Sequence, residues 1–94
     1  MPSLGVLTLE IFVEASHSLK DKRHVVKSLK DRLREHFNVA VAEIDHLDSW
    51  QHATLVVVTI ANDRVRAEQV LQAAESHAAG LLGGALAGSN VEWI

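Results

Sequence analysis

The chain has 94 residues, of which 48% are hydrophobic and 22% are charged, with one proline and a formal net charge of -3. This composition is typical of one compact domain spanning residues 1–94 and argues against a disordered chain. A chain of this length buries roughly 60–65% of its unfolded surface, which supports one modest core and excludes a deep cavity between subdomains. The absence of cysteine excludes disulfides and thiolate metal sites, and it fits a reducing compartment.

The N-terminal segment LGVLTLEIFV is apolar, but it contains Glu10, follows no basic segment and is too short to cross a bilayer. We therefore expect a cytoplasmic protein without membrane association. The segment instead has the period-two pattern of a half-buried strand. Its apolar positions are Leu7, Leu9, Ile11 and Val13.

The next segment is predicted to be a helix over residues 19–36. Ser18 is followed three residues later by Asp21, a spacing that resembles a capping box at a helix N-terminus. Apolar residues then recur at helical spacing and form the stripe that would face the core. They are Val25, Val26, Leu29, Leu33 and Phe37.

Two β-branched segments follow, NVAVAEID (38–45) and ATLVVVTIA (53–61), and the loop HLDSWQH between them is long enough for a hairpin. Asn62 or Asp63 is predicted to cap a second helix that ends near Gly80. The small-residue segment GLLGGALAGSN is predicted to be a mobile connector to a short terminal strand, VEWI (91–94).

The predicted order is strand, helix, strand, strand, helix, strand, which is the split βαβ arrangement of ferredoxin-like domains. The fold class is therefore α+β, a ferredoxin-like sandwich with a four-stranded antiparallel sheet. Right-handed crossovers place both helices on one face, with the first and third strands in the centre, and leave the other face open. This architecture hosts many unrelated functions, so the fold alone assigns none.

The cations are concentrated in the first predicted helix. Residues 20–34 hold seven of the nine Lys and Arg residues against two acidic residues, a net charge of +5, so the rest of the chain carries -8. At about 100° per residue, with Leu29 at zero, the apolar stripe centres at about 10° and five cations share a flank between about 100° and 180°. We call this set the basic flank: Lys20, Arg23, Lys27, Lys30 and Arg34. The opposite flank is mildly acidic and includes Asp31.

The basic flank has two interpretations. A solvated helix face that keeps the protein in solution is the simpler one. A surface that binds phosphates is the other, because residues 20–34 span about 21 Å at 1.5 Å per residue, enough to reach several successive phosphates. We favour the second interpretation because the charges of opposite sign lie on separate flanks. The partner would be a phosphate polyanion or an acidic protein surface.

The run SLKDKRHVVKSLKDRLREHFNVAVAE, with the DHLDSWQ that follows, closely resembles the YlxP-like family of small bacterial proteins of unassigned function. The similarity covers essentially the whole chain. It implies a ferredoxin-like fold. Because such proteins are typically encoded among translation-initiation and ribosome-maturation genes, it also implies a link to ribosomes or RNA. The family has no established catalytic residues to transfer to this sequence.

A second group of polar residues lies in EIDHLDSWQH, where carboxylates and imidazoles are close enough to suggest a metal site or an acid/base pair. Its members are Glu43, Asp45, His46, Asp48 and His52. We favour ordinary turn chemistry for them, and we expect Trp50 to pack over the end of the sheet. We therefore assign no catalytic residue, metal or cofactor. The alternative is a small-molecule or metal-dependent enzyme that uses this segment.

The third predicted strand is apolar on both sides, although only one side can meet the helices. A contiguous apolar patch on the other side would be an interaction surface, and a two-fold homodimer is the commonest way to bury it. We assign Phe12, Leu55 and Val57 to this dimer interface. Two alternatives stay open: GLLGGALAGSN could cover the face within one chain, or the domain could be a purely structural oligomerisation module.

Overall fold

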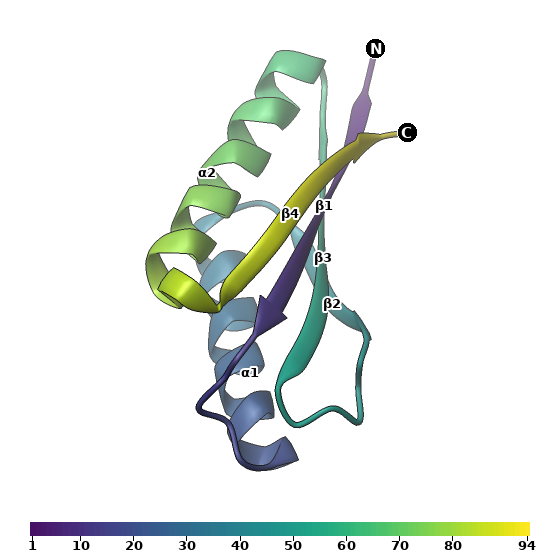
Figure 1. Ribbon diagram of the computed structural model, residues 1–94. Helices are drawn as coiled ribbons and strands as arrows, with labels where there is room; N and C mark the ends of the chain where they lie inside the picture. Colours follow the sequence, from purple (N-terminus) through teal and green to yellow (C-terminus); the bar gives the residue numbers. More distant parts are fainter.

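The computed structural model describes residues 1–94 as a four-stranded sheet with two helices on one face (Figure 1). The chain runs through β1 (Ser3–Phe12), α1 (Leu19–His36), β2 (Ala40–Asp45), β3 (His52–Ala61), α2 (Arg64–Leu82), the 3-10 turn η1 (Gly83–Ala85) and β4 (Leu86–Trp93). The spatial order of the strands is β2-β3-β1-β4, and every neighbouring pair is antiparallel. This confirms the predicted α+β architecture, with the first and third strands in the centre.

The helices begin where the sequence signals predict. Ser18 Oγ accepts a hydrogen bond from the Asp21 amide at 3.0 Å, and the Asp21 carboxylate accepts one from the His17 amide at 3.2 Å. Asp63 caps α2 by accepting from the Arg66 amide at 2.8 Å, which decides between the two predicted caps. Neither helix combines the length and the apolar character that a membrane-spanning helix requires.

The predicted connector at residues 80–90 is wrong. Helix α2 continues to Leu82, and Gly83 ends it with a φ of 54°, a conformation that favours glycine. Residues 86–90 then pair with β1, for example Gly88 with Glu10, so β4 begins five residues before the predicted strand. Because this segment forms an edge of the sheet, it does not fold over the open face, and that alternative is wrong as well.

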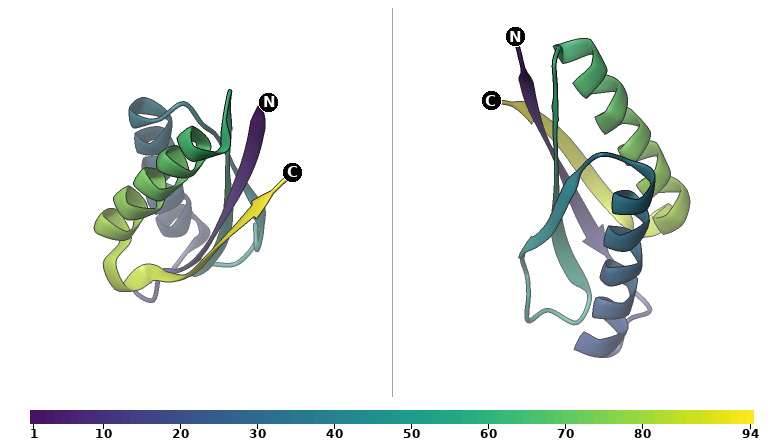
Figure 2. Two further views of the ribbon diagram at one scale, coloured as in Figure 1. Left: turned by 90° about the horizontal axis from the view of Figure 1, so that it is seen from above. Right: turned by 180° about the vertical axis from the view of Figure 1, so that it is seen from behind.

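The core lies between the sheet and the two helices (Figure 2), and each of the four elements that build it contributes three residues. Its members are Leu7, Leu9 and Ile11 of β1, Ala53, Leu55 and Val57 of β3, Val26, Leu29 and Leu33 of α1, and Leu71, Ala74 and Ala78 of α2. Helix α2 approaches β1 so closely that a Cβ on Gly5 would lie 2.6 Å from Leu71 Cδ1. Any larger residue at this position would force the side chains of Leu71 and Trp93 to shift.

The assignment of Leu55 and Val57 to the open face is wrong, because both are completely buried in the core beneath the helices. The opposite side of β3 is the exposed one, and it joins apolar side chains of β1 and β2 through the register of the sheet. We call this set the open-face patch: Leu4, Val6, Ala40, Ala42, Val56, Val58 and Ile60. Phe12 does lie on the same side of β1 as Leu4 and Val6, at the far end of that strand.

Candidate nucleic-acid interface

The basic flank lies on the outer surface of α1, as the helical projection predicts. Lys20 and Arg23 are exposed on the first turns, and Lys30 is half-buried near the middle. The side chains of Lys27 and Arg34 are 76% and 47% exposed. All five cations of the flank are therefore at least partly exposed.

The predicted separation of opposite charges is wrong at Asp31. Its carboxylate accepts hydrogen bonds from Lys27 Nζ at 2.8 Å and from an Arg34 guanidinium nitrogen at 3.1 Å, and it forms ion pairs with both. These hydrogen bonds, that from Lys27 first, hold the pKa of the Asp31 carboxyl below its ordinary value. Residues four and three apart on a helix are neighbours, and the long cationic side chains bend around the helix to reach the acid. Asp31 therefore partly neutralises the C-terminal half of the basic flank.

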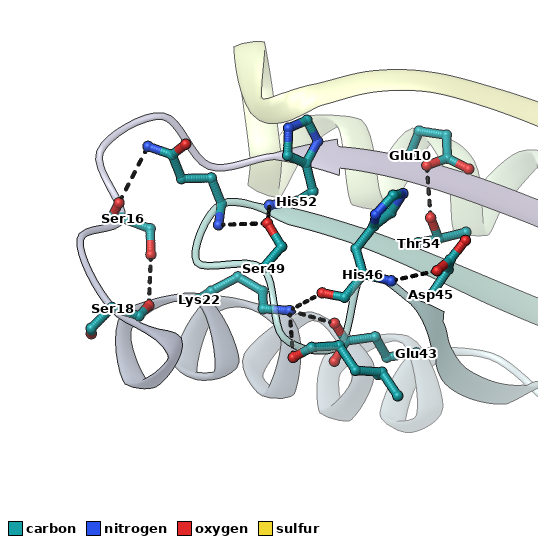
Figure 3. A network of polar contacts seen from close by, with 12 residues as sticks. Glu10, Ser16, Ser18, Lys22, Glu43, Asp45, His46, Ser49, His52 and Thr54 are labelled. Carbon is teal, nitrogen blue, oxygen red and sulfur yellow. Dashed lines mark hydrogen bonds and ion pairs between the residues drawn. The ribbon is translucent and has the colours of Figure 1, made fainter.

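Lys22 is absent from the surface, although it belongs to the same basic run. Its side chain is completely buried, and its ammonium donates to Glu43 Oε2 at 2.8 Å, to the His46 carbonyl at 2.9 Å and to the Leu47 carbonyl at 3.5 Å (Figure 3). The sequence contained a signal for this position, since the helical projection places Lys22 at about 20°, inside the apolar stripe. Outside the buried pair, residues 20–34 carry six cations against Asp21 and Asp31, a net charge of +4.

A groove runs between the basic flank and the edge strand β2. Both elements contribute to it, because α1 packs over this side of the sheet (Figure 2). Four of its seven lining residues are cations. The lining consists of Arg23, Val26, Lys27, Lys30, Asp31, Arg34 and Glu43. An anionic chain that follows α1 would therefore lie beside β2 and reach the β2–β3 loop at the N-terminal end of the helix.

The second predicted group, between Glu43 and His52, is divided between the two faces of the sheet. Glu43 pairs with Leu55 in the register and faces the helices, where Lys22 binds it. Asp45 lies opposite Thr54, whose hydroxyl donates to Glu10 at 2.8 Å, and the His46 and His52 rings are 5.6 Å apart (Figure 3).

No three His, Asp or Glu side chains in the structure are arranged to hold a metal ion. Asp48 is exposed in the loop. The structure therefore does not bring the members of this group together as a set of metal ligands.

Trp50 does not pack over the end of the sheet, and that prediction is wrong. Its side chain is 59% exposed, and Leu47 in the same loop is 53% exposed. The other tryptophan, Trp93, is partly buried against the core, with the Arg64 guanidinium 4.4 Å from its ring centre. Periodicity cannot distinguish these two cases, because Trp50 lies in a loop where side-chain direction follows no period.

The strand order, the two helices on one face and the open opposite face define a ferredoxin-like α+β domain. Within that class, a family model described as "Protein of unknown function (DUF503)" matches residues 4–87, and the chain belongs to this family. The chain is also 33% identical over 69 residues to the "Uncharacterized protein YlxP" of Bacillus subtilis (strain 168), which covers 73% of this chain and 75% of the relative. The resemblance to YlxP-like proteins is thereby confirmed.

Two solved structures share the fold. A de novo designed protein with ferredoxin fold, LFR1 1, matches with a TM-score of 0.51 and 12% identity over 100% of this chain and 84% of its own. A dimeric ferredoxin-like protein of unknown function from Thermobifida fusca matches with a TM-score of 0.51 and 14% identity over 97% of this chain and 90% of its own. At these identities the likeness establishes the fold alone.

Proposed function

We propose that this chain is a non-enzymatic, homodimeric binding domain that contacts RNA through the basic flank of α1. The proposal rests on one observation: a cationic surface and an apolar surface lie on opposite sides of the molecule. The cations belong to α1, whereas the open-face patch lies on the side of the sheet away from the helices. Figure 2 shows that both helices cover the same face of the sheet. One surface suits a polyanion, and the other suits an apolar partner.

The electrostatics support a phosphate backbone as the ligand of α1. The basic flank runs along about 21 Å of helix, which is comparable with the separation of several successive phosphates. Residues outside 20–34 carry a net charge of -8, which opposes a polyanion and makes the affinity weak and sensitive to salt. Between RNA and an acidic protein surface, the link with translation that the YlxP-like resemblance implies favours RNA.

A second copy of the chain is the proposed occupant of the open-face patch. Ile60 is 60% exposed, and Val58 lies between Val6 and Ala40 in the register, so the apolar surface is continuous across three strands. A contact of this kind around a two-fold axis is self-complementary. It would leave the two α1 helices on opposite outer surfaces, each free to bind RNA.

Binding of RNA is tested by comparing two charge variants. Replacing Lys27 and Lys30 with Glu lowers the charge of the basic flank by four. Replacing Arg66, Gln69 and Gln72 with Glu lowers the charge of α2 by the same amount at exposed positions. We expect the first variant to lose association with ribosomal particles in sucrose gradients of native lysate, and the second to keep most of it.

Salt dependence provides the second measurement. Three phosphate contacts, if Asp31 keeps Lys27 and Arg34, or five, if it releases them, predict that affinity falls about 20- to 500-fold between about 50 and 200 mM salt, from slopes of about -0.7 to -0.9 per contact. Binding that ignores salt, or that survives the Lys27 and Lys30 substitutions, would remove the RNA proposal.

A further inference from the structure

The β2–β3 loop, residues 46–51, is fixed by hydrogen bonds on its α1 side. Besides the two carbonyls that Lys22 binds, the Ser49 amide donates to the His46 carbonyl at 3.0 Å. Ser49 Oγ accepts from the amides of Gln51 at 3.3 Å and His52 at 3.0 Å. His46 adopts a φ of 60°, a left-handed conformation that is uncommon outside glycine, so the surrounding contacts determine the path of the loop.

The other end of the loop is tied to the connection between β1 and α1. The Val13 amide donates to the Gln51 carbonyl at 2.8 Å. The Gln51 side-chain amide donates to the carbonyls of Glu14 at 3.3 Å and Ser16 at 3.5 Å. The backbone on the C-terminal side of Trp50 is therefore held against the segment that leads into the first turn of α1.

This ordered loop exposes its largest side chain. A tryptophan that is 59% exposed on a fixed backbone leaves a flat aromatic surface in water, and no aromatic or cationic partner covers it. The rigid loop has already lost the conformational entropy that a flexible one would lose on binding. Trp50 is therefore a pre-organised contact surface.

The charges near the loop identify the kind of ligand. Lys22, which anchors the loop, lies in the first turns of α1 between Lys20 and Arg23 of the basic flank. Arg23 also lines the groove with Glu43, two residues before the β2 strand ends. The exposed carboxylate of Asp48 opposes anionic lipid headgroups and RNA phosphates alike, so the phosphates of a ligand would lie on the basic flank and not at the loop. The Lys22 hydrogen bonds hold the loop at the N-terminal end of α1, where Lys20 and Arg23 are exposed. Cations on the same side of a protein as an exposed aromatic ring are the combination with which proteins bind single-stranded nucleic acid.

We infer that Trp50 stacks on an unpaired base of single-stranded RNA whose phosphates follow the basic flank of α1. This inference rests on the proposed RNA function and specifies the class of RNA. The face of a base is accessible to a side chain only when the base is unstacked, so a continuous duplex is a poorer ligand. Lys22 is a positioning residue for this contact, because its ammonium holds the loop that carries Trp50.

The test uses Trp50 as its own reporter. The chain has two tryptophans, so Trp93→Phe leaves Trp50 as the sole source of tryptophan emission. The probes are an oligouridylate and an RNA duplex of mixed sequence, titrated at low salt. We expect the oligouridylate to quench the emission and to bind more tightly than the duplex.

Substitutions at Trp50 distinguish base stacking from the electrostatic affinity for RNA. In the Trp93→Phe protein, Trp50→Ala should weaken oligouridylate binding about 5- to 150-fold, measured by the fluorescence anisotropy of labelled RNA. Trp50→Phe should retain most of the affinity, because phenylalanine keeps an aromatic face. Val65→Ala removes another exposed apolar side chain, on α2, and should leave binding unchanged.

Three results would overturn the inference. If oligouridylate binds and the Lys27 and Lys30 substitutions abolish binding, but Trp50→Ala binds as tightly as its parent, stacking is wrong and the proposed function stands. If neither RNA binds, the proposed function fails as well. If the Trp50 emission shifts with phosphatidylglycerol vesicles and not with RNA, the loop is a membrane contact.

Discussion

The Lys22–Glu43 pair connects α1 with β2 and with the loop that follows β2. Because the Lys22 side chain is completely buried and Glu43 is 13% exposed, removing one partner leaves the other without its counter-charge in a site that is nearly closed to water. We predict that Lys22→Met lowers the free energy of unfolding by about 3 kcal/mol or more, measured by urea denaturation. Glu43→Gln should cost less, because Lys22 keeps the carbonyls of His46 and Leu47.

The double variant tests whether the two residues act as a pair. Lys22→Met with Glu43→Gln should lose less stability than the two single losses combined, because neither charge is left alone. A Lys22→Met protein with an unchanged urea midpoint would contradict this account. Additive losses in the double variant would contradict the direct pairing of the two side chains.

Helix α1 was predictable in its bounds and in the position of most of its cations, because apolar spacing and a polar cap determine both. The sequence could not show that Asp31 reaches across to Lys27 and Arg34. The projection places Cα positions around an axis, whereas long side chains meet several ångströms away from it. It also could not show that Glu43, twenty-one residues further on, is the partner of Lys22, since this contact depends on tertiary packing.

The pairing of Asp31 has a measurable consequence for the basic flank. The Asp31 carboxylate accepts hydrogen bonds from Lys27 and Arg34, so it competes with RNA for both cations. We predict that Asp31→Asn strengthens oligouridylate binding roughly 3- to 10-fold at low salt and steepens the salt dependence, because two cations become available for phosphates. The exposed pair contributes little to folding, so the urea midpoint should hardly change.

Asp21→Asn provides the control for Asp31→Asn. It also removes one negative charge from α1, but Asp21 makes its hydrogen bond with the His17 amide and none with the cations of the basic flank. Equal effects of the two substitutions would show that net charge alone determines binding. A loss of affinity in Asp31→Asn would show that the acid orients the two cations and does not compete for them.

The β4 edge shows why part of the fold was missed. Residues 86–90 are LAGSN, which have weak strand preference and no alternation, yet they complete the sheet because β1 offers unpaired backbone groups along its free side. The same lack of pattern affects β3, whose two faces are equally apolar, so the sequence could not decide which face meets the helices. Only the packing of Leu55 and Val57 against α1 and α2 resolves it.

At the scale of the whole molecule, the open-face patch is the surface on which a second copy would pack. Substitutions in this patch therefore test the proposed dimer. Ile60→Glu with Val58→Thr places a charge and a hydroxyl on the patch while keeping strand-compatible residues in β3. We predict that the parent chain has twice the mass of its 94 residues in light scattering and that this variant has the mass of one chain. Val65→Glu, at a 64% exposed position on α2, should remain dimeric.

The same monomeric variant tests whether the two basic flanks of a dimer act together. A short oligouridylate reaches one flank only, so the variant should bind it as tightly as the parent does. The variant should associate less tightly with ribosomal particles, where both flanks of a dimer engage. A monomeric parent, or a dimer that survives both substitutions, would exclude the open face as the interface.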